Sequence, residues 1–156
     1  MERKDIHAKM ELLDGLRKYF KVKDLDEARQ CLGMNLERST EGMFFLHQRK
    51  FIDALLTDHG MDQCKPVKTP LELDRHKVLA EGGSDGDQLN RQEQLRYQSL
   101  VGALNYLACN TRPDISAAVS FLAQYNSCCQ SIHMKAAKRV LRYIKGTREL
   151  GLTFRK

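Results

Sequence analysis

Three amphipathic stretches follow one another closely in the C-terminal half of the chain, and they constrain its fold more than any other feature. Apolar residues recur at three- and four-residue steps from about Gln94 to Cys109, from Thr111 to Tyr125 and from about Ser131 to Lys145. This spacing puts the apolar side chains of each stretch on one side of an α-helix. We therefore predict three helices that pack together.

The middle stretch, TRPDISAAVSFLAQY, has the strongest helix-start pattern in the chain. Thr111 can accept a hydrogen bond from the backbone at the helix start, and Pro113 suits the first turn. Asp114 follows three residues after Thr111, where a carboxylate favours the helix dipole. No residue here is typical of a reactive group, so we expect this start to fix where a helix begins.

The N-terminal part of the chain predicts one helix and one β-hairpin. Apolar residues at helical spacing predict a helix from Asp5 to Phe20. In CLGMNLER, strict alternation puts Leu32, Met34 and Leu36 on one face of a strand, and MFFLH reads as a second strand. The turn-rich residues from Ser39 to Gly42 would join the two strands.

The pattern between the hairpin and the three helices predicts a helix, an extended segment and a linker. The helix would run from about Gln48 to His59, with Gly60 at its C-terminal cap. The prolines of CKPVKTP favour an extended chain. The stretch from about 74 to 94 is polar and rich in glycine, which is typical of a linker. With a short final strand in LGLTF, the expected class is α+β and predominantly helical.

The excess positive charge is confined to one segment. The chain has a formal net charge of +6, and residues 131–148 contain six basic residues and no acidic one. These residues are Lys135, Lys138, Arg139, Arg142, Lys145 and Arg148. The five that precede Gly146 fall on one face of the predicted helix. A solvated helix face is one interpretation; the other is a polyanionic partner, since like charges at i,i+4 spacing destabilise an isolated helix.

Patterns typical of catalysis and cofactor binding are missing from the sequence. There is no Gly-rich phosphate loop, G-x-S-x-G or H-E-x-x-H pattern, so we expect no catalytic residue and no cofactor. The adjacent cysteines of CCQSIH are poorly spaced for a metal, and we expect two ordinary thiols and a helix-capping His133 instead of a zinc site. The N-terminal residues lack a secretory pattern and no long apolar run occurs, so an intracellular protein without a membrane partner is expected.

Several blocks of the sequence resemble the reverse transcriptase of copia-type (Pseudoviridae) long-terminal-repeat retrotransposons. They are FKVKDLDEARQCLGMNLERSTEGMFFLHQRKFIDALL, GMDQCKPVKTPLE, YQSLVGALNYLACNTRPDISAAVSFLAQY and HMKAAKRVLRYIKGT. The blocks keep the order of the family and extend from about Glu11 to Phe154. Asp26 replaces the usual glycine and Met134 the usual aromatic residue, and neither change affects the expected fold.

The resemblance implies a segment between two active sites. In the family, the polymerase aspartates precede the region that matches Met1, and ribonuclease H follows the region that matches Lys156. By this analogy, residues 1–47 are the end of the palm and 48–156 are a thumb- and connection-like helical region. The hairpin would match the element that grips the primer, with Gly33, Met34, Asn35, Gly42, Met43 and Phe44 as its candidate residues.

Two functions are compatible with these observations. The first is a non-catalytic module that binds a template–primer duplex, either RNA–DNA or DNA, through the six basic residues of 131–148. The second is a domesticated retroelement-derived protein that binds a host protein or forms a homo-oligomer through an exposed palm edge. Neither implies an enzyme activity of this chain by itself, and the sequence does not distinguish cytoplasm from nucleus.

Overall fold

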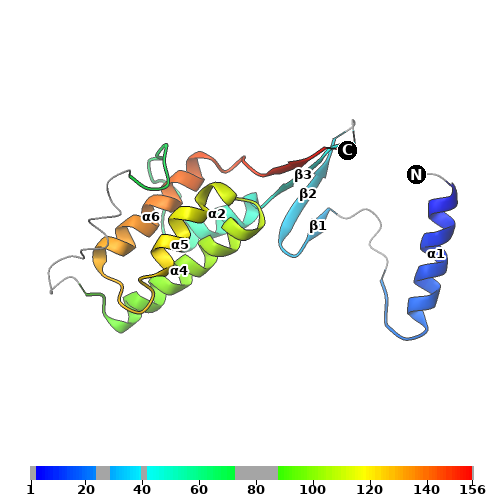
Figure 1. Cartoon of the computed structure of the whole chain (residues 1–156), viewed down its shortest axis with the longest axis horizontal. Helices are drawn as coiled ribbons and strands as arrows, with labels where there is room; N and C mark the ends of the chain where they lie inside the picture. Colours follow the sequence, from blue (N-terminus) through cyan, green and yellow to red (C-terminus); the bar gives the residue numbers. More distant parts are fainter. Residues whose placement is uncertain (1–2, 24–28, 40–41, 73–87, 156) are drawn as a thin grey trace.

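A computed structural model describes residues 3–23, 29–39, 42–72 and 88–155 of the chain. Figure 1 shows a helical body, a small sheet that extends from one end of it, and an N-terminal helix that lies apart beyond the sheet. The elements are α1 (Arg3–Arg17), β1 (Gln30–Cys31), β2 (Met34–Arg38), β3 (Phe44–His47), α2 (Arg49–Asp58), α4 (Arg91–Asn110), the 3₁₀ helix η2 (Pro113–Ile115), α5 (Ser116–Ala123), α6 (Ser131–Gly146) and β4 (Leu152–Phe154). The predicted class, α+β and predominantly helical, is confirmed.

The helical body has one hydrophobic core, to which α2, α4, α5 and α6 contribute. Its large, fully buried apolar side chains are Ile52, Tyr97, Leu100, Leu104, Leu107, Ile115, Leu122, Leu141 and Ile144. Full burial of such a side chain is worth about 1.5–3 kcal/mol relative to exposure. Because these residues recur at helical spacing, they were predictable from the sequence. This confirms the helix predicted from about Gln48 to His59 and the three helices predicted in the C-terminal half.

Helix α4 begins earlier than its apolar pattern predicts, at Arg91 instead of about Gln94. Asn90 and Glu93 form a reciprocal capping box: the Asn90 side chain accepts from the Glu93 amide and the Glu93 carboxylate accepts from the Asn90 amide, each at 3.0 Å. These bonds satisfy two amide donors that a helix start leaves unpaired. Residues 91–94 of the predicted linker therefore belong to α4, and residues 74–87 of it lie outside the described residues.

The four strands form one antiparallel sheet in the order β1-β2-β3-β4. The predicted hairpin is confirmed as β2 and β3, in which Leu36 pairs with Leu46. The predicted final strand is confirmed as β4, which pairs with the edge of β3 opposite β2, so that Leu152 lies beside Leu46. Strands from the two predicted regions, 1–47 and 48–156, thus share one sheet.

The prediction of one continuous strand through CLGMNLER is wrong. Leu32 and Gly33 have φ values of +48° and +77°, and they turn the chain between β1 and β2. Two consecutive positive φ values are characteristic of type I′ turns, which join tightly paired antiparallel strands. Leu32 is consequently 82% exposed, so it does not share a face with Met34 and Leu36.

The predicted capping role of Thr111 is also wrong, although Pro113 and Asp114 occupy the first turn of η2 as expected. Thr111 ends α4, and its hydroxyl donates to the buried Gln48 side chain at 2.8 Å. Asp114 accepts two hydrogen bonds from Arg112, at 2.8 and 2.9 Å. Arg112 is only 1% exposed, and a buried guanidinium is costly unless a carboxylate pairs with it. The Asp114 carboxylate is therefore used to pair with Arg112.

Candidate nucleic-acid interface

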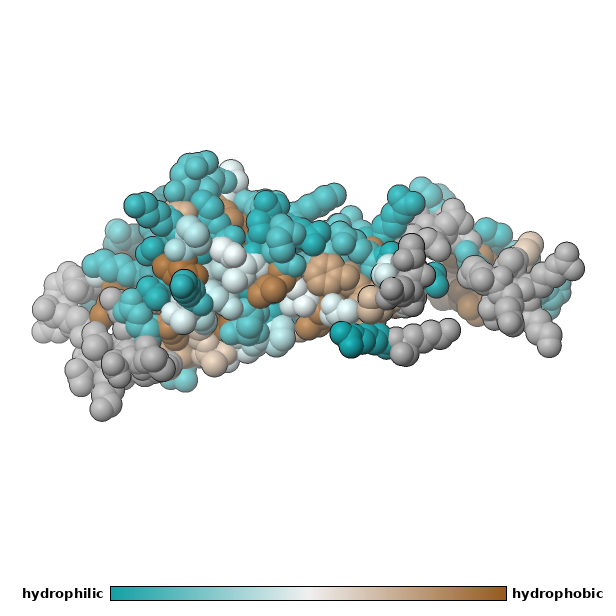
Figure 2. Space-filling model, turned by 90° about the horizontal axis from the view of Figure 1, so that it is seen from above, coloured by the Kyte–Doolittle hydropathy of each residue, from teal (hydrophilic) through white to brown (hydrophobic). Residues whose placement is uncertain are grey.

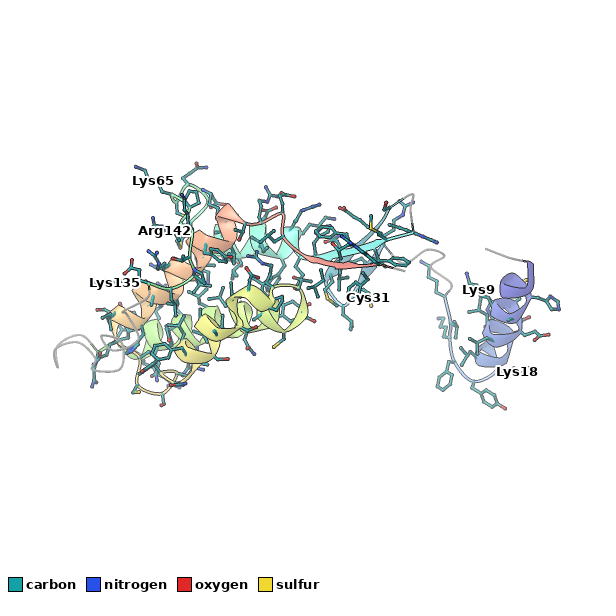
Figure 3. The ribbon with its side chains drawn as sticks, turned by 45° about the horizontal axis from the view of Figure 1, so that its top comes forward. Lys9, Lys18, Cys31, Lys65, Lys135 and Arg142 are labelled. Carbon is teal, nitrogen blue, oxygen red and sulfur yellow. The ribbon has the colours of Figure 1, made fainter. Side chains whose placement is uncertain are left out.

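Helix α6 separates its buried and charged residues as its sequence predicts. Ala136, Ala137, Val140, Leu141 and Ile144 are buried against the core. The basic residues lie on the opposite side, where Lys135 and Lys138 are exposed. Figure 3 shows Lys135 and Arg142 on the same side of the helical body.

The chain segment at residues 61–72 lies along this charged side and is held by it. Arg142 Nε donates to the Lys65 carbonyl at 2.7 Å, and Lys145 Nζ donates to the Cys64 carbonyl at 2.8 Å and to the Asp62 carbonyl. Arg139 donates to Thr69 and forms an ion pair with Glu72 at 2.8 Å. The like charges of α6 thus have an internal use, which is to hold an extended segment by its carbonyl oxygens.

Most of the positive charge nevertheless stays uncompensated by carboxylates. Hydrogen bonds to carbonyl oxygens orient Arg142 and Lys145 but leave their charges in place. Two exposed lysines of the 61–72 segment add to the charge; Figure 3 shows Lys65 beside Arg142. We call this set the basic face: Lys65, Lys68, Lys135, Lys138, Arg142 and Lys145. Sequence reasoning missed Lys65 and Lys68, although both lie in the proline-containing segment that it predicted to be extended.

The surface around the basic face is consistent with contact to a polar partner. Figure 2, which views the molecule from the upper side of Figure 1, shows many hydrophilic residues over the helical body, with hydrophobic residues among them. The other two predicted basic residues are paired with carboxylates: Arg139 with Glu72, and Arg148 with Asp53 at 2.8 Å.

The candidate hairpin residues lie near the other end of the helical body. Figure 3 shows Cys31, in β1, far from Lys135. Met34 and Asn35 are half-buried in β2, and Met43 is half-buried just before β3, while Phe44 is 37% exposed. Gly33 and Gly42 both have positive φ values, at turns on either side of β2. The structure therefore does not bring the two predicted sets of residues together at one point.

The β1–β2 turn is attached to the helical body by the side chain of Tyr106. The Tyr106 hydroxyl, from α4, donates to the Leu32 carbonyl at 2.5 Å. A Cβ atom on Gly33 would lie 2.8 Å from the same hydroxyl oxygen. Glycine is therefore required at position 33 both by the backbone conformation and by the approach of Tyr106.

An ion-pair network joins the sheet to the start of α2. The carboxylate of Glu37, in β2, accepts from the buried His47 ring and from Arg49, each at 2.9 Å. Arg49 also lies 2.6 Å from Glu149, which follows α6. The hydrogen bond from His47 and the charge of Arg49 hold the pKa of the Glu37 carboxyl below its usual value. This network links the hairpin to the start of α2 and to the residues that follow α6.

A second network ties the end of α4 to the end of α6. Besides its bonds to Asp114, the Arg112 guanidinium donates to the Thr147 carbonyl at 3.0 Å and to the Thr147 hydroxyl at 2.6 Å. Partial burial works to raise the pKa of the Asp114 carboxyl, but the hydrogen bonds and charge of Arg112 outweigh it and lower that pKa. The network is structural and explains why this stretch has a strong sequence pattern without reactive residues.

The CCQSIH stretch forms the start of α6. The predicted capping histidine is confirmed: His133 Nδ1 accepts from the Gln130 amide at 3.0 Å, and the ring stacks on Tyr125. Cys129 is buried and Cys128 is exposed. In the part of the chain that the structure describes, no group of three His, Cys, Asp or Glu side chains could hold a metal ion. Nor does any described helix combine the length and apolarity needed to cross a membrane.

Comparison with known proteins supports the retrotransposon origin that the residues suggested. The chain is 38% identical, over 92% of its length, to a retrovirus-related Pol polyprotein from transposon RE1 of Arabidopsis thaliana. It is 36% identical, over 85% of its length, to the corresponding polyprotein from transposon TNT 1-94 of Nicotiana tabacum. The chain is similar to a segment of retrotransposon Pol polyproteins.

The match covers only a small part of those relatives. The chain spans 9% of the RE1 polyprotein and 10% of the TNT 1-94 polyprotein. A shorter relative, an uncharacterised mitochondrial protein of Arabidopsis thaliana, is 36% identical over 93% of the chain, which spans 57% of that protein. No family model and no solved structure matches the chain.

Proposed function

We propose that this chain is the part of a copia-type reverse transcriptase that follows the catalytic Asp-Asp hairpin, and that it holds a template–primer duplex without catalysing polymerisation itself. Its similarity to Pol polyproteins over about nine-tenths of its length supports the origin. The ordered sequence blocks support the position within Pol. In this proposal the phosphates of the duplex are the ligands, and base sequence is not read.

The basic face is the observation that carries this proposal. Two elements far apart in sequence, α6 and the 61–72 segment, are held together so that their cations lie on one side of the molecule. Lys135 and Lys138 are exposed, and no carboxylate partner is found for them among the described residues. Cations arranged in this way favour a phosphate backbone over a single small anion.

The test is the binding of a recessed RNA–DNA duplex by fluorescence anisotropy across a salt series. About five phosphate contacts would give a slope of log affinity against log salt concentration near −4 to −5, by the value for B-form DNA. The K135A/K138A variant should reduce the magnitude of the slope by about 2, because each lost contact removes about 0.9.

The matched control is K18A/K21A, which removes two exposed lysines near the end of α1. It makes the same change in net charge, and it should leave the slope within experimental error. A wild-type slope near zero, or equal slopes for the two double variants, would contradict the proposal.

Exposed apolar residues favour a second candidate function, which is contact with a protein partner or with a second copy of the chain. In and just after α1, Met10, Leu12, Tyr19 and Phe20 are each more than half exposed. Such a concentration is typical of interaction surfaces. Light scattering at several salt concentrations tests this candidate: a stable oligomer that salt does not dissociate would favour it over duplex binding.

A further inference from the structure

The ion-pair network at the start of α2 borders a cleft of about 650 Å³. Its walls come from Arg29, from the β2–β3 hairpin, from the first half of α2 and from Arg148 after α6. Five basic residues line it: Arg29, Arg38, Arg49, Lys50 and Arg148. Ligand-binding clefts usually have volumes of about 300–1,000 Å³ but are mostly apolar. A cleft of this size with such a lining fits a small, strongly charged group.

Positive charge exceeds negative charge in this cleft. The carboxylates in its lining are Glu37 and Asp53, and both are engaged, with Arg49 and Arg148 respectively. Arg29 and Lys50 are exposed, and no carboxylate partner is found for either among the described residues. Arg49 and Arg148 are therefore held in place by these acids, whereas Arg29 and Lys50 have no carboxylate partner in the described part of the chain.

The first turn of α2 adds to the positive potential of the cleft. It contains no acidic residue, and Gln48 provides no side-chain cap. The first hydrogen bond within the helix is from the Ile52 amide to the Gln48 carbonyl, so the amides of Lys50 and Phe51 precede it. Amides at such a position carry partial positive charge toward an anion.

We propose that this cleft is a second anion site, which binds a backbone phosphate of a nucleic-acid strand. The proposal rests on the proposed function, which supplies the strand. Arg148 lies two residues beyond the end of α6, so the cleft adjoins the end of the helix that carries Lys138, Arg142 and Lys145. A strand bound along the basic face would place a further phosphate in the cleft.

The first experiment titrates the ¹⁵N-labelled chain with inorganic phosphate at constant ionic strength and follows backbone amide shifts. Saturable shifts are expected at Lys50 and Phe51. The R29A/K50A variant should weaken this binding about tenfold or more, because hydrogen bonds to charged groups are the stronger kind. R29Q/K50Q, which keeps more of the side-chain length, should behave alike and guards against loss of folding.

Two further variants serve as controls. K18A/R91A removes one lysine and one arginine that are exposed elsewhere, and K135A/K138A alters only the basic face. Both should keep the wild-type phosphate shifts in the cleft. Shifts that are missing in the wild type, or that R29A/K50A leaves unchanged, would overturn the proposal.

The second experiment replaces inorganic phosphate with a ten-nucleotide single-stranded DNA. The same amides should shift at a tenfold or more lower concentration, since a strand also contacts the basic face. If only inorganic phosphate shifts them, the assignment to a strand is overturned. If the chain fails to bind the duplex but keeps the phosphate-induced amide shifts, only the proposed function is refuted. If it binds the duplex but shows no such shifts, only the anion site in the cleft is refuted.

Discussion

Arg112 is the residue that couples the end of α4 to the end of α6. It is 1% exposed, and Asp114 and Thr147 accept hydrogen bonds from it. The cost of burying its charge is offset only while these partners remain. Arg112 lies between α4 and η2, and its partner Thr147 follows α6. The junction between α4 and η2 therefore depends on a residue at the end of a third helix.

We predict that Asp114→Asn destabilises the fold by about 2–3 kcal/mol, because it leaves a buried guanidinium without a counter-charge. The value lies below the range of about 3–5 kcal/mol for fully buried pairs because the Asp114 side chain is 31% exposed. Urea unfolding measures the change. Asp58→Asn, at an exposed position, is the control and should change the free energy of unfolding by less than about 0.5 kcal/mol.

Gly33 gives a second prediction at this scale. Gly33→Ala should destabilise by about 2 kcal/mol, since it adds the cost of a left-handed backbone to a clash with the Tyr106 hydroxyl. In the Tyr106→Phe background the clash is relieved, so the same substitution should cost only about 1 kcal/mol.

Gly102→Ala is the contrast, because Gly102 lies within α4 and a Cβ there would meet nothing within 4 Å. It should stabilise by about 0.5–1 kcal/mol. Thermal or urea unfolding of the four variants tests the set, and an equal cost of Gly33→Ala in both backgrounds would contradict the role given to Tyr106.

Among the elements, α6 has two functions that its sequence does not separate. Lys135 and Lys138 project from it, whereas Arg139, Arg142 and Lys145 hold the 61–72 segment. All five look alike in the sequence, because the acceptors that distinguish them are mainly backbone carbonyls, which any residue supplies. The confinement of the basic residues to one face of α6 could therefore be predicted. Which of them hold the 61–72 segment and which project from the helix could not.

We predict that Lys145→Met loosens the 61–72 segment, because the apolar side chain cannot donate to the carbonyls of Asp62 and Cys64. Hydrogen-exchange protection at the Met61 and Cys64 amides should fall about tenfold. Lys135→Met makes the same chemical change at an exposed position of the same helix. Equal effects of the two substitutions would refute the holding role.

The elements that could be predicted from the sequence are those in which many apolar residues repeat at one spacing. Four helices of the body were predicted within a few residues because their apolar residues repeat over several turns. The break at Leu32 was missed because a leucine in the left-handed region has no sequence pattern. Arg112 was missed because arginine is ordinarily exposed, so its burial depends on partners from distant elements. The cleft at the start of α2 was missed for the same reason, since its basic residues come from four separate places.

At the scale of the whole molecule, the sheet and the helical body each contain a carboxylate with a lowered pKa. These are Glu37, whose ordinary value is 4.5, and Asp114, whose ordinary value is 3.8. The unfolded chain binds protons at each group before the folded chain does. Their contribution to stability is thus complete above the unfolded pKa values and is lost as the pH falls through the folded ones.

We therefore predict that the free energy of unfolding decreases as the pH is lowered below about 4.5, through the protonation of both carboxylates. Urea unfolding at a series of pH values measures the decrease. E37Q/D114N should start from a lower stability and change less over the same pH range. A decrease as steep in the double variant as in the wild type would assign the acid sensitivity to other groups.

The pairing of β3 with β4 has a consequence for how the molecule folds. It joins Leu46 to Leu152, whereas the β2–β3 hairpin and the helices form from residues close in sequence. Contacts between distant residues close a long loop and therefore tend to form slowly. We expect the sheet to be completed after the helical body, and the cleft beside it, which needs both the hairpin and Arg148, to form last. Phosphate bound there would then act as a reporter of the final folding step.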